Sequence, residues 1–157
     1  KPKSGIHSDR EKESGTDKAQ KLMLTWITSY PDIMEQITDY ISPDDFTTDL
    51  YHKVAVMIFE QYHEGEINPA RLLSRFDDSD ETRKVTALFN AVIPLNSDAE
   101  KMQALSDVIC NMKEHSINYR SSRLDPTDMQ GLQEVMRDKK ALEQWKENGI
   151  RLHISFD

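Results

Sequence analysis

The chain has 157 residues with one cysteine, five glycines and no long apolar run. The single Cys110 excludes an internal disulfide and any zinc site built from several cysteines. So few glycines disfavour a β-sandwich or barrel, in which tight turns recur at short intervals. No segment approaches the roughly 20 consecutive apolar residues of a membrane span, and no signal peptide is visible at the N-terminus. We therefore expect a soluble, cytoplasmic, helical protein.

Negative charge is concentrated in the first half of the chain. The net charge is −8 overall, yet residues 22–81 hold thirteen acids and three bases, which gives this stretch a charge of −10. Such a surface repels phosphate and makes the first half of the chain a poor platform for nucleic acid. We therefore expect no direct binding of nucleic acid, and the lack of an apolar span predicts no membrane partner.

Residues 1–15 are polar and lack hydrophobic periodicity, which predicts a disordered linker. From residue 16 onward, apolar residues recur at helical spacing. Pro31, Gly65 and Pro94 are expected to end segments. Residues 16–112 therefore predict a helical bundle. Its inward-facing side chains are expected to be Leu22, Trp26, Ile27, Tyr30, Ile33, Met34, Ile37, Ile41, Leu50, Tyr51, Val54, Ile58, Tyr62, Leu72, Leu73, Phe76, Val85, Leu88, Phe89 and Val92.

Capping residues mark the expected helix starts, because a side-chain oxygen there satisfies free backbone N–H groups. A capping box adds a second acidic or amide side chain three residues later. The expected caps are Ser42 before Pro43, Thr47 or Thr48, Asn68 before Pro69, Asp78 with Glu81, Ser97 with Glu100, and Asp125 before Pro126.

The last third of the chain predicts two longer helices. Met102, Leu105, Ile109, Met112, Ser116 and Tyr119 follow one another at steps of three and four, typical of one helix of roughly 25 residues. A second helix follows Pro126 and ends at Gly149, which favours an antiparallel pair. The predicted fold is therefore all-α: a compact helical bundle followed by a long helix that projects into a C-terminal antiparallel hairpin. Residues 113–157 form this hairpin and a short, extended tail.

No pattern for catalysis or metal binding is complete. Glu60 and His63 have the spacing found in di-iron bundles, but those sites need a second such motif and two further glutamates. Cys110 has no base and orienting group beside it, which favours a packing role. The acids of residues 77–81 lack the glycine and terminal glutamate of a calcium loop. We expect no catalytic residue, metal or cofactor here; a metal-binding helical-bundle enzyme is the disfavoured alternative.

The predicted hairpin carries more apolar side chains than two helices bury against each other. They are Met112, Tyr119, Met129, Leu132, Met136, Leu142 and Trp145. Methionine and aromatic residues outside a closed core are typical of partner surfaces. Two interpretations remain open at this point: a docking surface for another protein, or a hairpin that folds back so that all of these residues are core.

Residues 21–37, 44–76 and 85–92 together resemble the C-terminal helicase-binding domain of bacterial DnaG-type primases. Their segments are KLMLTWITSYPDIMEQI, DDFTTDLYHKVAVMIFEQYHEGEINPARLLSRF and VTALFNAV. The closing ALEQWKENGIRLHIS is similar to the end of clostridial and bacillus members of that family.

The resemblance implies docking onto the N-terminal domains of the hexameric DnaB-type replicative helicase, which recruits primase to the replication fork. The bundle would modulate the helicase and the hairpin would anchor to it. This fragment would not be an enzyme, whereas the full-length primase would polymerise RNA with zinc and magnesium in upstream domains. Some members also bind the acidic tail of the single-strand binding protein, which the charge of −10 disfavours here. The module would act in the bacterial cytoplasm, associated with the nucleoid through the replisome.

We choose candidate helicase-binding residues from hairpin geometry: Tyr119, Arg120, Arg123, Leu124, Met129, Leu132, Met136, Lys140, Trp145, Leu152 and Ile154. Removal of residues 125–157 is expected to leave the bundle folded and to abolish binding. The N-terminal domain of the replicative helicase itself shares the architecture and is the nearest alternative; a phosphate-binding loop encoded downstream would identify it. A general nucleic-acid binder is a further alternative.

Overall fold

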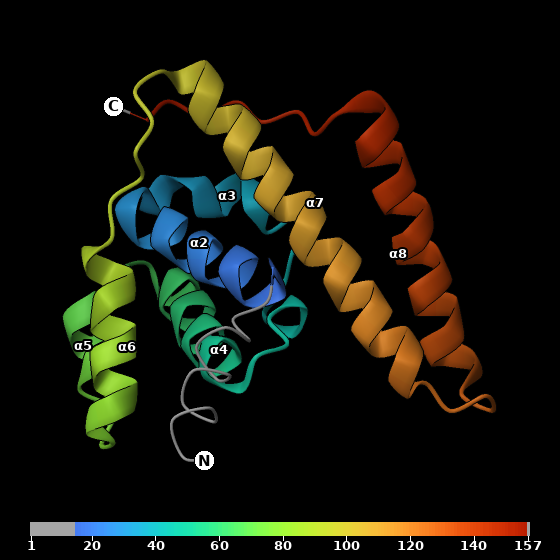
Figure 1. Ribbon diagram of the computed structural model, residues 1–157, viewed down its shortest axis with the longest axis horizontal. Coiled ribbons are helices and arrows are strands. Elements are labelled where there is room, and N and C mark those ends of the chain that lie inside the picture. The colour runs from blue at the N-terminus through green and yellow to red at the C-terminus, as the bar shows by residue number, and fades with distance from the viewer. Residues whose placement is uncertain (1–14, 157) are drawn as a thin grey trace, which may run out of the picture.

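The computed structural model describes residues 15–156, which form helices, short 3-10 turns and connecting segments without any strand (Figure 1). The prediction of an all-α protein is therefore confirmed. The disordered linker predicted for residues 1–15 lies outside the described residues, except for Gly15. Gly15 is the first residue of a helix and does not belong to a linker.

Seven α-helices follow one another along the described chain. In order they are α2 (Gly15–Ser29), α3 (Met34–Ile37), α4 (Asp49–Glu64), α5 (Pro69–Leu73), α6 (Ser79–Asn90), α7 (Asp98–Arg123) and α8 (Met129–Asn148). Two 3-10 turns, η1 (Pro31–Ile33) and η2 (Pro43–Asp45), lie between the first three helices.

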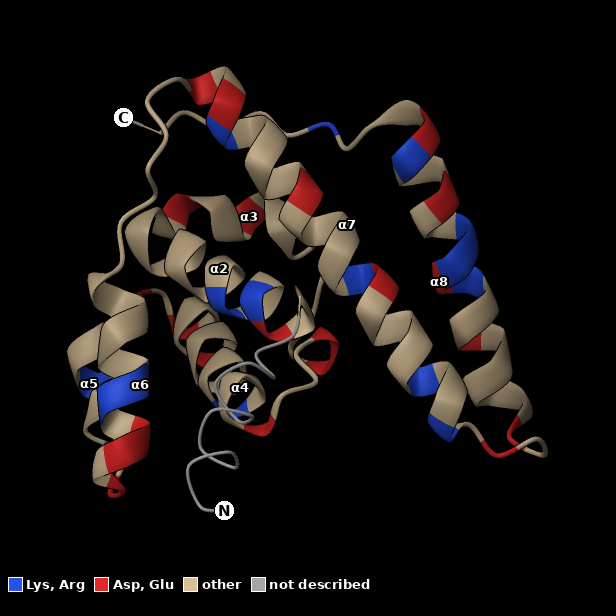
Figure 2. Cartoon of the chain, viewed as in Figure 1, with Lys and Arg blue, Asp and Glu red and all other residues tan. Residues whose placement is uncertain are grey.

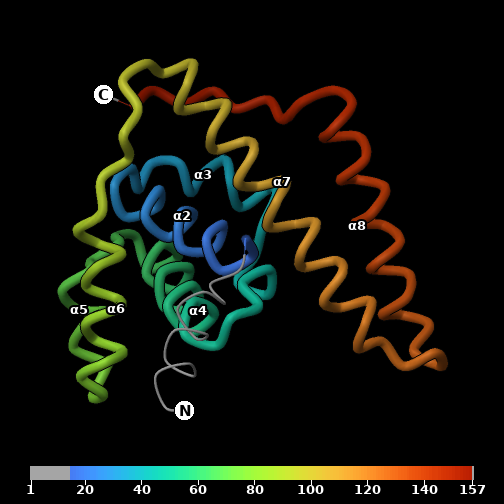
Figure 3. The backbone as a smooth tube through the Cα atoms, in the orientation of Figure 1, coloured from blue at the N-terminus to red at the C-terminus, as the bar shows by residue number. Residues whose placement is uncertain are grey.

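Helix α2 lies at the centre of the main core and packs against α4, α6 and α7 (Figure 3). Its Met23, Leu24, Trp26 and Ile27 are fully or almost fully buried. The remaining core comes from every other element of the bundle, including the predicted Ile33, Met34, Ile37, Ile41, Val54, Ile58, Leu72, Phe76, Val85 and Leu88. Burial of this apolar surface is the main favourable contribution to folding.

Most residues predicted to start or end a helix make the expected hydrogen bonds. Ser42 and Asp45 form a capping box around η2, and the Asn68 side chain accepts from the backbone N–H of Arg71. Ser97 caps α7 by accepting from the backbone N–H of Glu100 at 3.1 Å. Gly65 ends α4 with φ of 116°, a left-handed conformation that favours glycine.

Two apolar residues assigned to the core face are on the surface. Leu22 is 45% exposed and Val92 is 82% exposed. On α2 the next residue, Met23, is buried instead of Leu22. Consecutive residues of a helix point in directions about 100° apart, so choosing the wrong one of two neighbours assigns a surface side chain to the core. Val92 lies beyond the end of α6 at Asn90, so the helical periodicity of α6 does not predict the direction of its side chain.

Three predicted caps differ in detail. The Thr48 side chain makes no cap bond and donates instead to the Asp17 carboxylate. Asp78 caps α6 by accepting from the backbone N–H of Asp80, rather than through a box with Glu81. Helix α8 starts three residues later than Pro126 suggests, because Asp128 caps it and Asp125 stabilises the turn before it through Thr127.

Helices α7 and α8 lie side by side and run antiparallel (Figure 1). Two ion pairs between them show the register, since Arg120 pairs with Asp138 and Glu114 pairs with Lys146. A small apolar cluster of Ile117, Val135 and Leu142 lies between the helices, separate from the main core.

The C-terminal tail returns to the bundle after Gly149. Leu152 and Phe156 are each 7% exposed and belong to the main core. The backbone of His153 exchanges two hydrogen bonds with the Gln36 side chain on α3, both at 2.6 Å. The tail is therefore extended against the bundle, as its alternating pattern predicts.

Candidate docking surface

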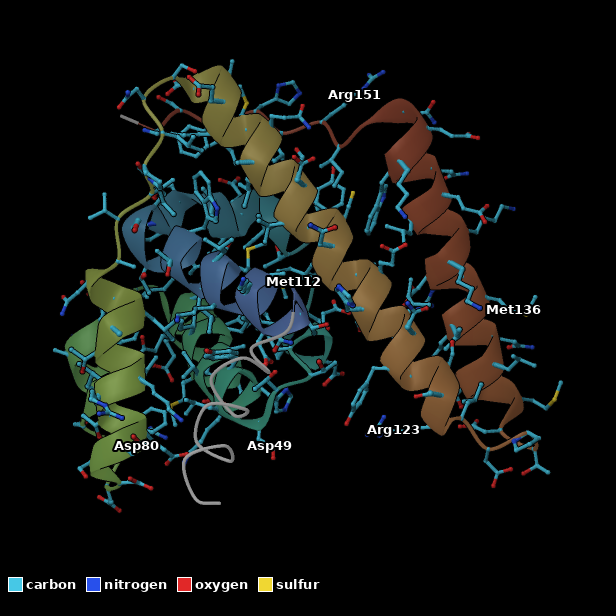
Figure 4. The ribbon with its side chains drawn as sticks, in the orientation of Figure 1. Asp49, Asp80, Met112, Arg123, Met136 and Arg151 are labelled. Carbon is cyan, nitrogen blue, oxygen red and sulfur yellow. The ribbon has the colours of Figure 1, made fainter. Side chains whose placement is uncertain are left out.

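The outer part of the α7–α8 hairpin exposes most of the large apolar side chains that lie on the surface of the described residues. Met129 is 62% exposed, Met136 is 60% exposed, and Leu132 and Tyr119 are each 39% exposed. Figure 4 places Met136 on α8, far from the bundle. Met129, Leu132 and Met136 recur at steps of three and four and so share one face of α8, which we name the apolar stripe.

The stripe points away from the small core that joins the two helices. Val135 and Leu142 are buried against α7, while Met136, next in sequence to Val135, is exposed. Consecutive helical positions differ by about 100°, so α8 has one face packed on α7 and another apolar face that no described residue covers.

Charged residues of both signs flank the stripe, including the exposed acids Asp128 and Glu134. Lys139 and Lys140 follow Met136 on α8 and are exposed, and Figure 2 shows basic residues on α8 and on the outer half of α7. The guanidinium of Arg123 stacks on the ring of Tyr119 at 3.8 Å from its centroid, a cation–π contact.

A groove of about 350 Å³ separates the ends of the two helices. Tyr119, Arg120, Arg123, Leu124 and Val135 are among its lining residues. Arg120 donates to the Asp138 carboxylate through one terminal nitrogen, while its Nε is buried without a hydrogen-bond partner in the described structure. An unpaired buried donor of this kind costs free energy.

Three of the predicted docking residues are packed inside the molecule. Leu152 is a core residue and is not available on the surface, which corrects its assignment. Trp145 and Ile154 are half-buried against the main core, and the Trp145 ring meets the Tyr40 ring edge-on at 5.2 Å between centroids. These residues hold the hairpin and tail to the bundle. The remaining eight lie on or near the outer part of the hairpin.

The side chains considered for metal or nucleophilic chemistry do not form a larger cluster within the described residues. Glu60 and His63 are exposed, and residues 15–156 contain no group of three or more potential metal ligands. Asp80 instead pairs with Lys84 and Arg83, and the Lys84 hydrogen bond lowers the pKa of its carboxyl. Burial raises the pKa of the Cys110 thiol, which leaves less of it as the nucleophilic thiolate.

A second groove, which we did not predict, lies between α2 and the segment after α6. It measures about 340 Å³ and is lined by Lys18, Lys21, Leu22, Thr25, Ala91, Val92 and Ile93. The two misassigned apolar residues, Leu22 and Val92, are both in it. A sequence signal exists: Lys18, Lys21, Leu22 and Thr25 share one face of α2, where an apolar residue stands between lysines and a threonine.

No helix among residues 15–156 is long and apolar enough to cross a membrane. Comparison with known proteins brings no further assignment: no family model, no curated protein and no solved structure matches the chain.

Proposed function

We propose that this chain is a protein-docking module, the C-terminal helicase-binding domain of a DnaG-type primase. In this proposal, the outer part of the hairpin, residues 117–148, is a docking arm that binds the N-terminal domains of the hexameric replicative helicase. Residues 16–112 form the bundle that carries the arm and modulates the helicase. The module recruits primase to the fork by raising its effective concentration there, in the bacterial cytoplasm.

The observation that carries the proposal is the exposed apolar stripe of Met129, Leu132 and Met136. Leaving an apolar side chain in water forgoes about 1.5–3 kcal/mol of burial free energy for each residue. Three such residues on one face of one helix, on an arm held together by a small cluster, are typical of a surface that a partner covers.

The stripe fits a helix of the partner. Its residues recur at helical spacing, so an opposing helix with apolar side chains at the same spacing would pack along it. Methionine side chains adapt to varied apolar surfaces, which suits such a contact. Lys139 and Lys140 alternate with acids such as Glu134 around the stripe, so a partner helix with charges of both signs beside its apolar face fits it.

A direct binding measurement tests this proposal. The 157-residue chain and the N-terminal region of the replicative helicase from the same genome are titrated by calorimetry. We expect binding, and a loss of at least about tenfold in affinity for the M129Q/L132Q/M136Q variant, since central apolar contacts dominate interfaces. The L22Q/V92Q variant is the matched control, because it also replaces exposed apolar residues but lies outside the arm. Absence of binding by the unaltered chain, or equal loss in both variants, would contradict the proposal.

A second candidate role involves the groove between α2 and the segment after α6. It combines apolar lining residues with Lys18 and Lys21, and none of the lining residues in the described part of the chain is acidic. Lys18 and Lys21 are bases outside residues 22–81, over which the charge of −10 was counted. The groove suits an acidic peptide with apolar residues at its end, which is the character of the single-strand binding protein tail.

The two roles separate experimentally. In fluorescence anisotropy with a labelled tail peptide from the same genome, K18E/K21E is expected to lose binding, whereas M129Q/L132Q/M136Q keeps it. The reverse is expected with the helicase. Peptide binding that survives K18E/K21E would contradict this second role and leave the first untouched.

The N-terminal domain of the replicative helicase remains the alternative identity. Under that identity the arm would bind primase or another copy of the helicase, and the parent gene would encode a phosphate-binding loop downstream. Sequencing beyond codon 157 distinguishes the two, and calorimetry against a primase C-terminal domain gives an independent answer.

A further inference from the structure

A buried carboxylate joins the bundle to α7 at the level where the arm begins. Asp45 of η2 is 4% exposed and accepts three hydrogen bonds. Its Oδ2 accepts from the Ser42 backbone N–H at 2.9 Å and from Lys113 Nζ at 2.8 Å. Its Oδ1 accepts from Ser116 Oγ at 2.7 Å. Each carboxylate oxygen is therefore bonded to a different point on α7.

The position of this cluster along α7 is informative. Leu105, Ile109 and Met112, which precede it, are buried in the main core. Ile117, immediately after it, packs with Val135 and Leu142 of α8 instead, and Tyr119 is exposed. The Asp45 cluster thus lies at the boundary between the part of α7 that belongs to the bundle and the part that belongs to the arm.

The η2 side of the cluster is itself held in place. The backbone oxygen of Pro43 lies 2.9 Å from His52 Nδ1 on α4. The buried Gln20 side chain of α2 donates to Thr47 Oγ1 at 3.1 Å and accepts from the Thr48 backbone N–H at 3.0 Å. The segment that carries Asp45 is therefore fixed to both α2 and α4.

Stability alone gives little reason for this arrangement. Burying an ammonium and a carboxylate removes both from water, and a well-packed apolar pair of similar size is often as stable or more stable. The hydrophobic effect is non-directional, whereas hydrogen bonds to two points on one helix require defined lengths and angles at both points. Buried polar groups are in some proteins the means by which one packing is selected.

We infer that Asp45, Lys113 and Ser116 form an orientation lock that fixes the direction in which the arm leaves the bundle along α7, while Trp145 and the tail attach the other end of α8. Asp45 is then a positioning residue for the arm, which places the apolar stripe without touching it. This inference goes beyond the proposed function, because it concerns the free protein and holds for any partner of the arm.

The lock is tested by measuring the distance between a label on the bundle and a label on the arm. Arg123 lies seven residues beyond Ser116, about 10 Å along the helix, so a rotation of about 20° at the lock moves that point by about 3–4 Å, and α8 by more. Spin labels at A87C on α6 and Q133C on α8, in a C110A background, report this distance by double electron–electron resonance. Both label positions are exposed.

The lock is removed by D45N/K113M, which deletes both charges and leaves no buried ion unpaired. We expect the narrow Ala87–Gln133 distance distribution to broaden or shift by several ångströms. Labels at A87C and Q103C, which span the bundle and the first part of α7, should keep their distance. The matched control is D80N/K84M, which removes an exposed ion pair on α6 and should change neither distance.

Each result of these measurements either supports or overturns the inference. An unchanged Ala87–Gln133 distance distribution in folded D45N/K113M protein overturns the inference. A broad distribution in the labelled protein that retains Asp45 and Lys113 overturns it as well. Should D45N/K113M fail to fold, S116A removes one hydroxyl and leaves the ion pair. We expect a smaller broadening there, and a distribution identical to that of the parent overturns the inference equally. No helicase is present in these measurements, so their failure is separate from failure of the docking proposal.

Discussion

Arg120 of α7 and Asp138 of α8 form an ion pair at 2.8 Å, and both side chains are more than two-thirds buried. It lies beside the Ile117 cluster and in the same antiparallel register as the exposed pair of Glu114 and Lys146. The arm is thus held by a few apolar side chains and two ion pairs of different exposure.

We expect the two ion pairs to differ in coupling energy. Exposed pairs are typically worth about 0–1 kcal/mol because water and salt screen them, and Glu114–Lys146 belongs to this class. The Arg120–Asp138 pair is screened less and should exceed it by about 1 kcal/mol. Double-mutant cycles with R120A, D138A, E114A and K146A, measured by urea unfolding, compare them. Equal coupling energies would show that the arm is hydrated throughout.

The two faces of α8 should respond differently to truncation. V135A and L142A each remove a buried side chain and should cost about 2–4 kcal/mol of unfolding free energy. M129A and M136A remove side chains that are about 60% exposed and should change it by less than about 0.5 kcal/mol. Urea unfolding of the four variants tests this contrast. Large losses from both methionines would mean that the stripe is covered within the protein itself.

Local signals explain why so much of the fold was predictable. Gly65 has positive φ, Asn68 caps α5 before Pro69, and the box of Ser42 and Asp45 involves residues three apart. Each feature depends on a few neighbouring residues, so the sequence alone contains the necessary information. The exposed apolar residues of the arm were predictable for a similar reason, since two helices bury only one face against each other.

Contacts between distant residues explain the failures. Leu152 was assigned to the docking surface because its alternating segment contains nothing that identifies what it packs on. The core cluster that it joins includes residues such as Trp26, more than 100 positions away in the sequence. The groove of Lys18, Leu22 and Val92 was likewise missed because it depends on how α2 meets the end of α6. Asp125 and Asp128 are both good caps, and only the path of the chain between the helices selects one of them.

The predicted effect of truncation changes as well. Removal of residues 125–157 was expected to leave the bundle folded. Because Leu152 and Phe156 are part of the main core, we now expect this deletion to destabilise the bundle. Point substitutions in the apolar stripe therefore test docking more cleanly than the deletion does.

The cap at the start of α8 gives a third prediction. The Asp128 carboxylate accepts from the Gly131 backbone N–H at 2.9 Å, whereas the Asp125 carboxylate accepts from Thr127 in the preceding turn. D128A should therefore cost about 1 kcal/mol of unfolding free energy, within the usual range for helix caps. The matched D125A should cost less, because it leaves the helix cap intact. Urea unfolding decides between the two positions, and a larger loss from D125A would contradict the observed cap.

Glu114 gives the arm a predictable response to acid. The hydrogen bond from Lys146 lowers the pKa of the Glu114 carboxyl below its ordinary value, and the same bond raises the pKa of Lys146. For the carboxyl, the stabilising contribution is present above the unfolded-state pKa and is lost as pH falls through the lower folded-state pKa. The pair is exposed, so the effect is a few tenths of a kcal/mol.

The measurement is the difference in unfolding free energy between the parent chain and E114Q across the acidic range. The difference should be constant near neutral pH and should vanish below the folded-state pKa of Glu114. For Lys146, whose pKa is raised, the contribution is present at neutral pH and disappears only at strongly alkaline pH. A difference that grows as pH falls would have the wrong sign for this ion pair.

The C-terminal tail should be a large contributor to stability. The centroid of the Phe156 ring lies 5.8 Å from that of Trp26 and 5.1 Å from that of Tyr30. Lys101 Nζ lies 5.5 Å from the centroid of the Phe156 ring. F156A empties this aromatic site and should cost about 3–5 kcal/mol of unfolding free energy. R151A is the control, since Figure 4 shows Arg151 at the surface, and it should change stability by less than about 0.5 kcal/mol.

The same substitution has an optical signature that a general loss of stability does not produce. In a W145F background, Trp26 is the remaining tryptophan and is 1% exposed. Removal of the Phe156 ring admits water beside it, so the emission of folded F156A protein should move to longer wavelength. R151A should leave the emission unchanged. Phe156 and Tyr30 are the rings that contact Trp26 among the described residues. An unchanged spectrum and unchanged stability in F156A would therefore show that the tail does not close the bundle.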